Sequence, residues 1–126
     1  MGGTAGLIIK ELLMLTKEAL NEFGANTEEG LKRCFGNEEF YLKMVRSLTK
    51  EATFTKLNDA IAAGDLQAGF EAAHALKGVL SNLSMTPILT PVTEMTELLR
   101  NHTDMDYSAL LSQVNEKRAA LEELCD

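Results

Sequence analysis

Apolar residues recur at helical spacing along most of the chain, and this pattern limits the folds that it can adopt. Leu66, Ala73, Leu76, Leu80 and Leu83, for example, lie on one stripe of a helix. The sequence has only two prolines and no long alternating run of β-branched residues, so strands are not indicated. With 126 residues, 45% of them hydrophobic, the chain is long enough to bury one core. We therefore predict a single all-α domain.

Glycines and capping residues divide the first part of the chain. Residues 1–6 are small and glycine-rich and are expected to be flexible. Residues 7–23 have the spacing of an amphipathic helix, which Gly24 would end. A short linking helix is predicted next, capped by Thr27 and ended by Gly36. The single domain is expected to span residues 7–126, with 7–23 as an extra N-terminal helix.

A long arm over Asn37–Ala63 is predicted to open the main bundle, with Asn37 as its N-cap. The periodicity loosens near residue 52, where Thr53 is placed to cap a fresh segment. Gly64 suits the residue after the end of this arm, and Asp65 suits the N-cap of the next helix. The core stripe of the first half of the arm is expected to consist of Tyr41, Met44, Val45 and Leu48.

Two further helices are predicted after residue 83. Proline is disfavoured beyond the first turn of a helix, so the next regular helix is expected to begin near Pro91, after a looser turn that holds Pro87. Asp104 or Asp106 is expected to cap the last helix. Short connections favour antiparallel neighbours. We therefore predict an antiparallel four-helix bundle over residues 37–124, preceded by the extra N-terminal helix and the short linking helix.

One histidine is expected on the outer face of the third bundle helix. His74 projects away from the apolar stripe, Lys77 places a positive charge beside it, and Gly78 leaves it uncovered because helical side chains lean toward the N-terminus. A neutral imidazole is a nucleophile, and a nearby lysine can offset the charge of an incoming anion. These residues fit a landing place for a phosphoryl group. The alternative is that His74 is an ordinary surface residue and Gly78 a packing contact. Four further side chains lie around the histidine in projection: Gln67, Phe70, Glu71 and Ser81.

The stretch Ala73–Gly78, followed by Asn82-Leu83, closely resembles the signature of histidine-containing phosphotransfer (HPt) domains of the stand-alone bacterial type. Gly30–Tyr41 and Ala62–Leu66 extend this resemblance over about residues 24–124. The resemblance implies that His74 is phosphorylated, that Lys77 is a charge partner and that Gly78 provides clearance. The chain departs from the family pattern at Ser84, where glycine is frequent, and by placing Gly69 on the buried stripe next to Phe70. The residues expected to dock partners are Gln67, Phe70, Glu71, Ser81 and Asn82.

The resemblance implies a monomeric, cytoplasmic phosphorelay carrier rather than an enzyme. The carrier would take a phosphoryl group from a receiver-domain aspartate onto His74 and pass it to another receiver, without an ATP site of its own. Its partners would be response-regulator receivers and a hybrid sensor histidine kinase. No cofactor is expected in the chain, because Mg²⁺ would belong to the receiver. Two alternatives stay open: a receiver-binding scaffold that accepts no phosphate, and an enzyme that hydrolyses the receiver's acyl phosphate.

Other functions are less favoured by the composition. A net charge of −7 argues against nucleic-acid binding, and no apolar run reaches the length of a membrane span. Neither a secretory signal nor a basic membrane-binding face is evident. His102 near Asp104 and Asp106 lacks a second histidine at ligand spacing, so no metal site is predicted. Cys34 and Cys125 are expected to be thiols, although only geometry can exclude a disulfide.

Overall fold

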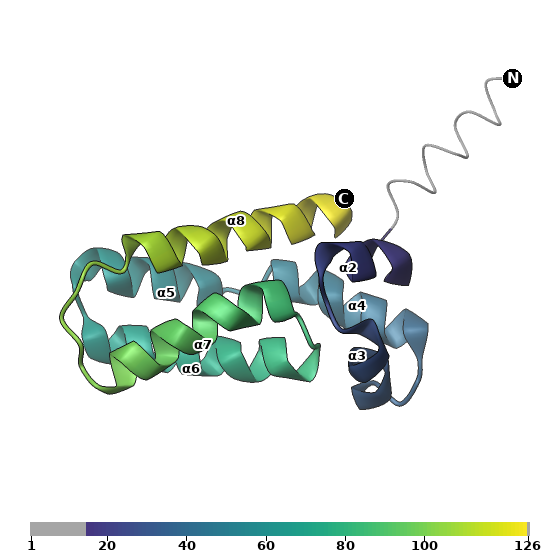
Figure 1. Ribbon diagram of the computed structural model, residues 1–126, viewed down its shortest axis with the longest axis horizontal. Coiled ribbons are helices and arrows are strands. Elements are labelled where there is room, and N and C mark those ends of the chain that lie inside the picture. Colours follow the sequence, from purple (N-terminus) through teal and green to yellow (C-terminus); the bar gives the residue numbers. More distant parts are fainter. Residues whose placement is uncertain (1–14, 126) are drawn as a thin grey trace, which may run out of the picture.

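The computed structural model describes residues 15–125, which form helices and no strand. The predicted flexible residues 1–6, and residues 7–14 of the predicted N-terminal helix, lie outside the described part. The helices, labelled as in Figure 1, are α2 (Lys17–Phe23), α3 (Thr27–Arg33), α4 (Glu38–Thr49), α5 (Thr53–Ala63), α6 (Leu66–Asn82), α7 (Thr86–Arg100) and α8 (Ser108–Cys125). The predicted all-α class is confirmed.

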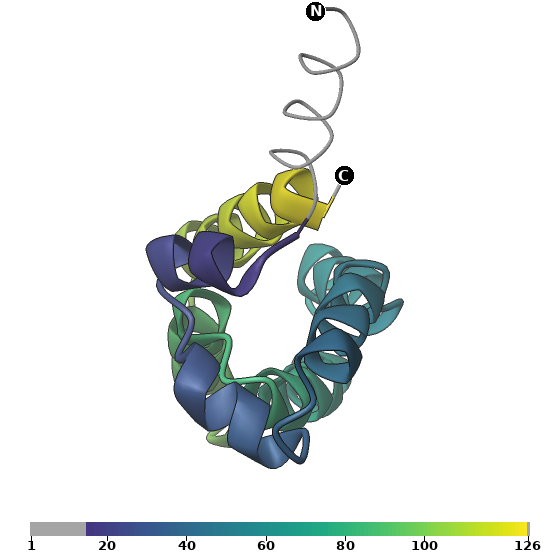
Figure 2. The ribbon, with the colours of Figure 1, turned by 90° about the vertical axis from the view of Figure 1, so that its right-hand side faces the viewer.

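The bundle consists of the α4–α5 arm together with α6, α7 and α8. Helices α4 and α5 follow one another along the long axis, and α6 returns beside α5 (Figure 1). Helix α6 packs against α5 and α7, while α8 packs against α7 and α4. Seen end-on, these helices surround a common centre, and α2 and α3 lie at the end of the bundle where α8 finishes (Figure 2). The predicted helical bundle with a short linking helix, α3, is confirmed.

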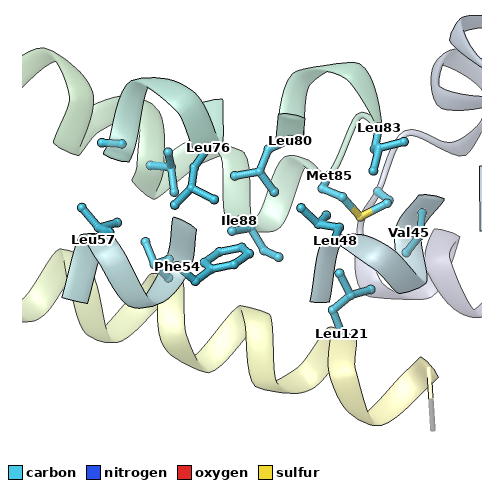
Figure 3. Packing of buried hydrophobic residues seen from close by; sticks show 14 of the residues in the cluster. Val45, Leu48, Phe54, Leu57, Leu76, Leu80, Leu83, Met85, Ile88 and Leu121 are labelled. Carbon is cyan, nitrogen blue, oxygen red and sulfur yellow. The ribbon is translucent and has the colours of Figure 1, made fainter. Parts of the chain in front are cut away.

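The centre of the bundle is filled by aliphatic and aromatic side chains from all of these helices. Figure 3 shows Leu57 and Phe54 of α5 facing Leu76 and Leu80 of α6, with Ile88 between them. All of these side chains are 0% exposed. Burying a side chain of this size contributes about 1.5–3 kcal/mol, so the core provides most of the force that holds the helices together.

Local capping determines where α6 begins and ends. Gly64 ends α5 with a φ of +69°, and the Asp65 carboxylate accepts a hydrogen bond from the Ala68 N–H at 3.0 Å. At the other end, Ser84 follows α6 with a φ of +54°, the left-handed region that glycine adopts most easily. This backbone conformation explains why a glycine suits position 84.

The C-terminal end of α6 is anchored by the first helices of the chain. The buried Tyr41 hydroxyl donates to the Leu83 carbonyl at 3.0 Å, and the Asn26 N–H donates to the Ser84 carbonyl at 3.0 Å. Gly30 lies so close to the Tyr41 ring that an added Cβ would be 2.6 Å from Cε1. These contacts fix α3 and α4 against the end of the helix that carries His74.

The break in the arm lies where it was predicted, between Thr49 and Thr53, and α8 secures it. The Arg118 guanidinium of α8 donates to the Thr49 carbonyl at 3.0 and 3.2 Å. The same guanidinium lies 4.6 Å from the centroid of the Phe54 ring. One residue of α8 therefore satisfies a carbonyl at the end of α4 and covers the start of α5.

Five sequence-based expectations about elements are wrong. Thr27 and Thr53 are first residues of helices rather than caps, since Asn26 and Ala52 precede them as N-caps. Met44 was expected in the core stripe but is 38% exposed. The helix predicted over 7–23 does not run unbroken, because Thr16 is extended and its hydroxyl accepts from the Ala19 N–H as the cap of α2.

Pro91, the fifth of these, lies inside α7 rather than at its start. Helix α7 begins at Thr86, with Met85 as N-cap and Pro87 in the first turn. Pro91 cannot donate a helical hydrogen bond, but its side chain is buried together with Ile88 and Val92. The packing of these residues outweighs one missing bond, so the helix continues through the proline.

Candidate functional site

His74 lies in the middle of α6, on the side that faces away from the core, and it is exposed. Its imidazole stacks on the Phe70 ring, with 5.6 Å between the ring centroids and 18° between the planes. Phe70 is half-buried and packs against the core cluster. Within residues 15–125 the imidazole has no hydrogen-bond or ion-pair partner. Phe70 therefore orients the ring while its nitrogens stay available to a partner.

Gly78 leaves open space one turn after His74. A Cβ built at this position would meet no atom within 4 Å outside its own helix. Gly69 on the buried side differs, because its Cβ would lie 3.3 Å from Leu99 Cδ2 of α7. Gly78 is therefore not a packing contact, which removes one alternative raised by the sequence. The role of Gly78 in access stays a prediction.

Lys77 does not stand alone beside the histidine, because it shares a carboxylate with a second cation. Its Nζ lies 4.0 Å from Oε1 of Glu97 on α7, and Nη2 of Arg100 lies 3.6 Å from the same oxygen. The Arg100 guanidinium also lies 5.4 Å from the centroid of the Phe70 ring. Exposed ion pairs of this length contribute little to stability, so both cations can leave Glu97 at small cost.

These contacts link five side chains on the α6–α7 surface in series, from His74 through Phe70, Arg100 and Glu97 to Lys77. The first, second and last belong to α6, and the other two come from α7. We call this set the His74 cluster. Sequence reasoning missed both α7 residues. Their only signal is an acid and a base three residues apart, and that spacing does not show which helix they face.

The five residues predicted to dock partners all lie on α6. Gln67 and Glu71 are exposed and joined by a hydrogen bond of 3.3 Å from Nε2 to Oε1. Phe70 lies under the imidazole, as described above. Ser81 is half-buried and Asn82 exposed, both toward the C-terminal end of the helix. The structure thus brings them together on one helix, but their role in docking stays a prediction.

Asn82 also borders an apolar groove that was not expected from the sequence. The groove lies where α6 ends against α4 and the α3–α4 connection, and its lining includes Phe35, Phe40 and Met44. Phe35 is 93% exposed and has a φ of +60°, a left-handed conformation that is unusual for a bulky residue. The groove therefore places an exposed aromatic side chain near the predicted docking residues.

The remaining candidate residues lie elsewhere. His102 is exposed in the connection between α7 and α8, and Asp106, two residues before the start of α8, accepts from the Ser108 N–H at 2.9 Å. Hydrogen bonds from the Ser108 side chain and from its backbone N–H lower the pKa of the Asp106 carboxyl. Cys34 is buried, and burial raises the pKa of its thiol. Among residues 15–125 there is no cluster of metal-ligating side chains and no helix able to cross a membrane.

Comparison with known proteins places the chain in a family. The family model described as "Hpt domain" matches residues 49–126, more than half of the chain, including α5–α8 and all five residues of the His74 cluster. Gly30–Tyr41 lies outside this match, so the resemblance of that stretch stays a prediction. No curated protein and no solved structure matched the chain. With an exposed histidine in the middle of the matched bundle, the chain belongs to the Hpt domain family.

Proposed function

We propose that the protein is a phosphorelay carrier that accepts a phosphoryl group on His74 from a receiver-domain aspartate and gives it to another receiver. The observation that supports this most strongly is the setting of His74: an exposed, oriented imidazole with open space at Gly78 and a cation at Lys77. All three residues lie in the part of the chain that matches the family. The same membership supports a carrier role without an ATP site of its own.

The reaction needs little from this chain beyond position and charge. A lone pair on an imidazole nitrogen forms a P–N bond as the bond between phosphorus and the aspartyl oxygen breaks, and the aspartate leaves as a carboxylate. Phosphoryl transfer depends on in-line geometry and on stabilising the charge of the equatorial oxygens. Phe70 would hold the ring plane, and Lys77 would offset charge. We assign Mg²⁺ to the receiver, and in this chain we infer no cofactor.

The partners and setting remain part of the proposal. We infer that receiver domains dock over Gln67, Phe70, Glu71, Ser81 and Asn82, and that a hybrid sensor histidine kinase supplies the phosphate. The net charge of −7 is unsuited to nucleic acid. A monomer in the cytoplasm stays our prediction.

The test is transfer from a phosphorylated receiver to the purified protein, compared with His74→Gln and with His102→Gln as the matched control. We expect the parent protein and the control to gain an acid-labile, base-stable phosphoryl group, and His74→Gln to gain none. Because His74 is exposed, its replacement should change the free energy of unfolding by less than about 0.5 kcal/mol, measured by thermal melting.

Three outcomes would contradict the proposal. Labelling of His74→Gln would move the acceptor elsewhere. Binding of the receiver without transfer to the parent protein would indicate a scaffold. Release of free phosphate without a protein adduct would indicate hydrolysis of the receiver's acyl phosphate.

A further inference from the structure

Glu97 is the acidic member of the His74 cluster and pairs with both of its cations. A carboxylate beside a phosphate-accepting histidine is unfavourable for the product, because a phosphoryl group is itself an anion. Resting on the proposed function, we infer that Glu97 is a built-in counter-ion that competes with the phosphoryl group for Lys77 and Arg100. It would thereby limit how tightly His74 holds phosphate.

The geometry joins both cations to one atom. Glu97 Oε1 lies 4.0 Å from Lys77 Nζ and 3.6 Å from Arg100 Nη2. In the described part of the chain, Glu97 is the one carboxylate that pairs with either of them. The Glu97 side chain is 54% exposed, that of Lys77 is 35% exposed and that of Arg100 is 48% exposed. They are therefore held by charge rather than by packing and are able to change partners.

Each cation is linked to His74, Lys77 through the helical spacing of α6 and Arg100 through the Phe70 ring. Lys77 follows the histidine by three residues on α6, a spacing at which helical side chains are neighbours. Arg100 lies over the Phe70 ring, which stacks on the imidazole. A phosphoryl group on His74 would thus form within reach of the cations that Glu97 holds in the unmodified protein.

Charge arithmetic gives the direction of the effect. Without phosphate, the two cations and the one carboxylate of the His74 cluster sum to a net charge of about +1, with a neutral imidazole. A phosphoryl group adds close to two negative charges, so the sum becomes about −1, whereas without the Glu97 charge it would be about 0. Replacing Glu97 by glutamine removes both the competition for the cations and the repulsion between anions. The phosphorylated form therefore gains relative to the unmodified form.

The consequence for a carrier is that phosphate can leave as readily as it arrives. A site with two unopposed cations would retain the phosphoryl group and slow its return to a receiver aspartate. As the phosphoryl group departs, Glu97 can again pair with Lys77 and Arg100. In this inference Glu97 is a positioning residue that acts through Lys77 and Arg100, and it forms no bond to phosphorus.

The experiment measures the equilibrium constant for phosphoryl exchange between one phosphorylated receiver and the purified protein. This constant is independent of how fast the two proteins meet. We expect Glu97→Gln to shift it toward the phosphorylated carrier by about three- to tenfold at low salt, the size expected for partly exposed charges. The shift should shrink as salt is raised. A merely structural role would change the melting temperature but not a salt-dependent equilibrium.

Glu94→Gln is the matched control, because Glu94 is exposed on the same helix and the change in net charge is identical. A shift equal in both variants would overturn the inference, since it would show only a general effect of charge. If the parent protein accepts phosphate on His74 but Glu97→Gln has the same exchange equilibrium constant, the inference is also overturned. Failure of the parent protein to accept phosphate would instead refute the proposed function.

Discussion

Replacing Gly78 by leucine separates two explanations of an exposed glycine in the middle of a helix. Glycine costs about 1 kcal/mol against alanine in such a position, and leucine is nearly as favourable as alanine. Because a Cβ at position 78 would meet nothing within 4 Å, the substitution meets no steric obstacle at its first atom. We therefore expect Gly78→Leu to stabilise the protein by roughly 0.5–1 kcal/mol, and to raise its melting temperature by about 2–4 °C.

The same side chain should block the chemistry. A leucine on α6 leans toward the N-terminus of the helix and would cover the imidazole one turn before it. Displacing a reacting group by about 1 Å can lower a rate on the order of a hundredfold. We therefore expect the rate of transfer from a phosphorylated receiver to fall by about tenfold or more. Thermal melting and the transfer rate are measured on the same preparation.

Gly78→Ala is the matched control for this experiment. It gains the same helix propensity, but its methyl group is too short to cover the ring, so it should be stable and keep most of its transfer rate. A lower melting temperature for Gly78→Leu would show that the position is packed after all. A stable variant with the parent rate would refute the access argument.

Two further predictions concern the end of α6. Ser84→Gly should raise the free energy of unfolding by about 1–2 kcal/mol in urea titrations, because Ser84 has a φ of +54° and its buried hydroxyl oxygen has no partner in the described structure; a less stable variant would contradict this. Burial raises the pKa of Tyr41 from 10 to about 12, so the folded protein holds this proton more tightly than the unfolded chain does. The resulting stabilisation of the folded state is complete below pH 10 and is lost as the pH rises through about 12. Tyr41→Phe should lower stability at pH 7 by about 1 kcal/mol and weaken this loss at high pH, and an unchanged pH profile would count against it.

Several helix ends were predictable because the decisive interaction is local, although the equally local caps at Thr16 and Asn26 were missed. Asn37 and Asp65 each accept a hydrogen bond from an N–H three residues ahead, and Gly64 has the positive φ that its place after a helix suggested. Such interactions lie within one turn of sequence. The face of α6 that carries His74 was predictable for the same reason, since it depends only on the 3.6-residue period.

Features that depend on a neighbouring helix were not predictable. Met44 has the correct spacing for the core, but in the middle of α4 it is 38% exposed and lines the apolar groove with Phe35 and Phe40 instead. Pro91 continues α7 because of its buried environment, which local propensity does not describe. Glu97 and Arg100 belong to the same class, because their place beside His74 requires the register of α7 against α6.

Gly69 accounts for that register. A Cβ at position 69 would lie 3.3 Å from Leu99 Cδ2, so glycine permits α7 to approach α6 at this point more closely than a larger residue would. Leu99 is fully buried in this contact, and Arg100 follows it directly while Glu97 precedes it by two residues. Fixing Leu99 therefore also fixes the height of both charged residues along α6, where Lys77 and Phe70 receive them. Gly69, on the buried side of α6, thus helps to set where Glu97 and Arg100 of α7 lie along the exposed side of α6.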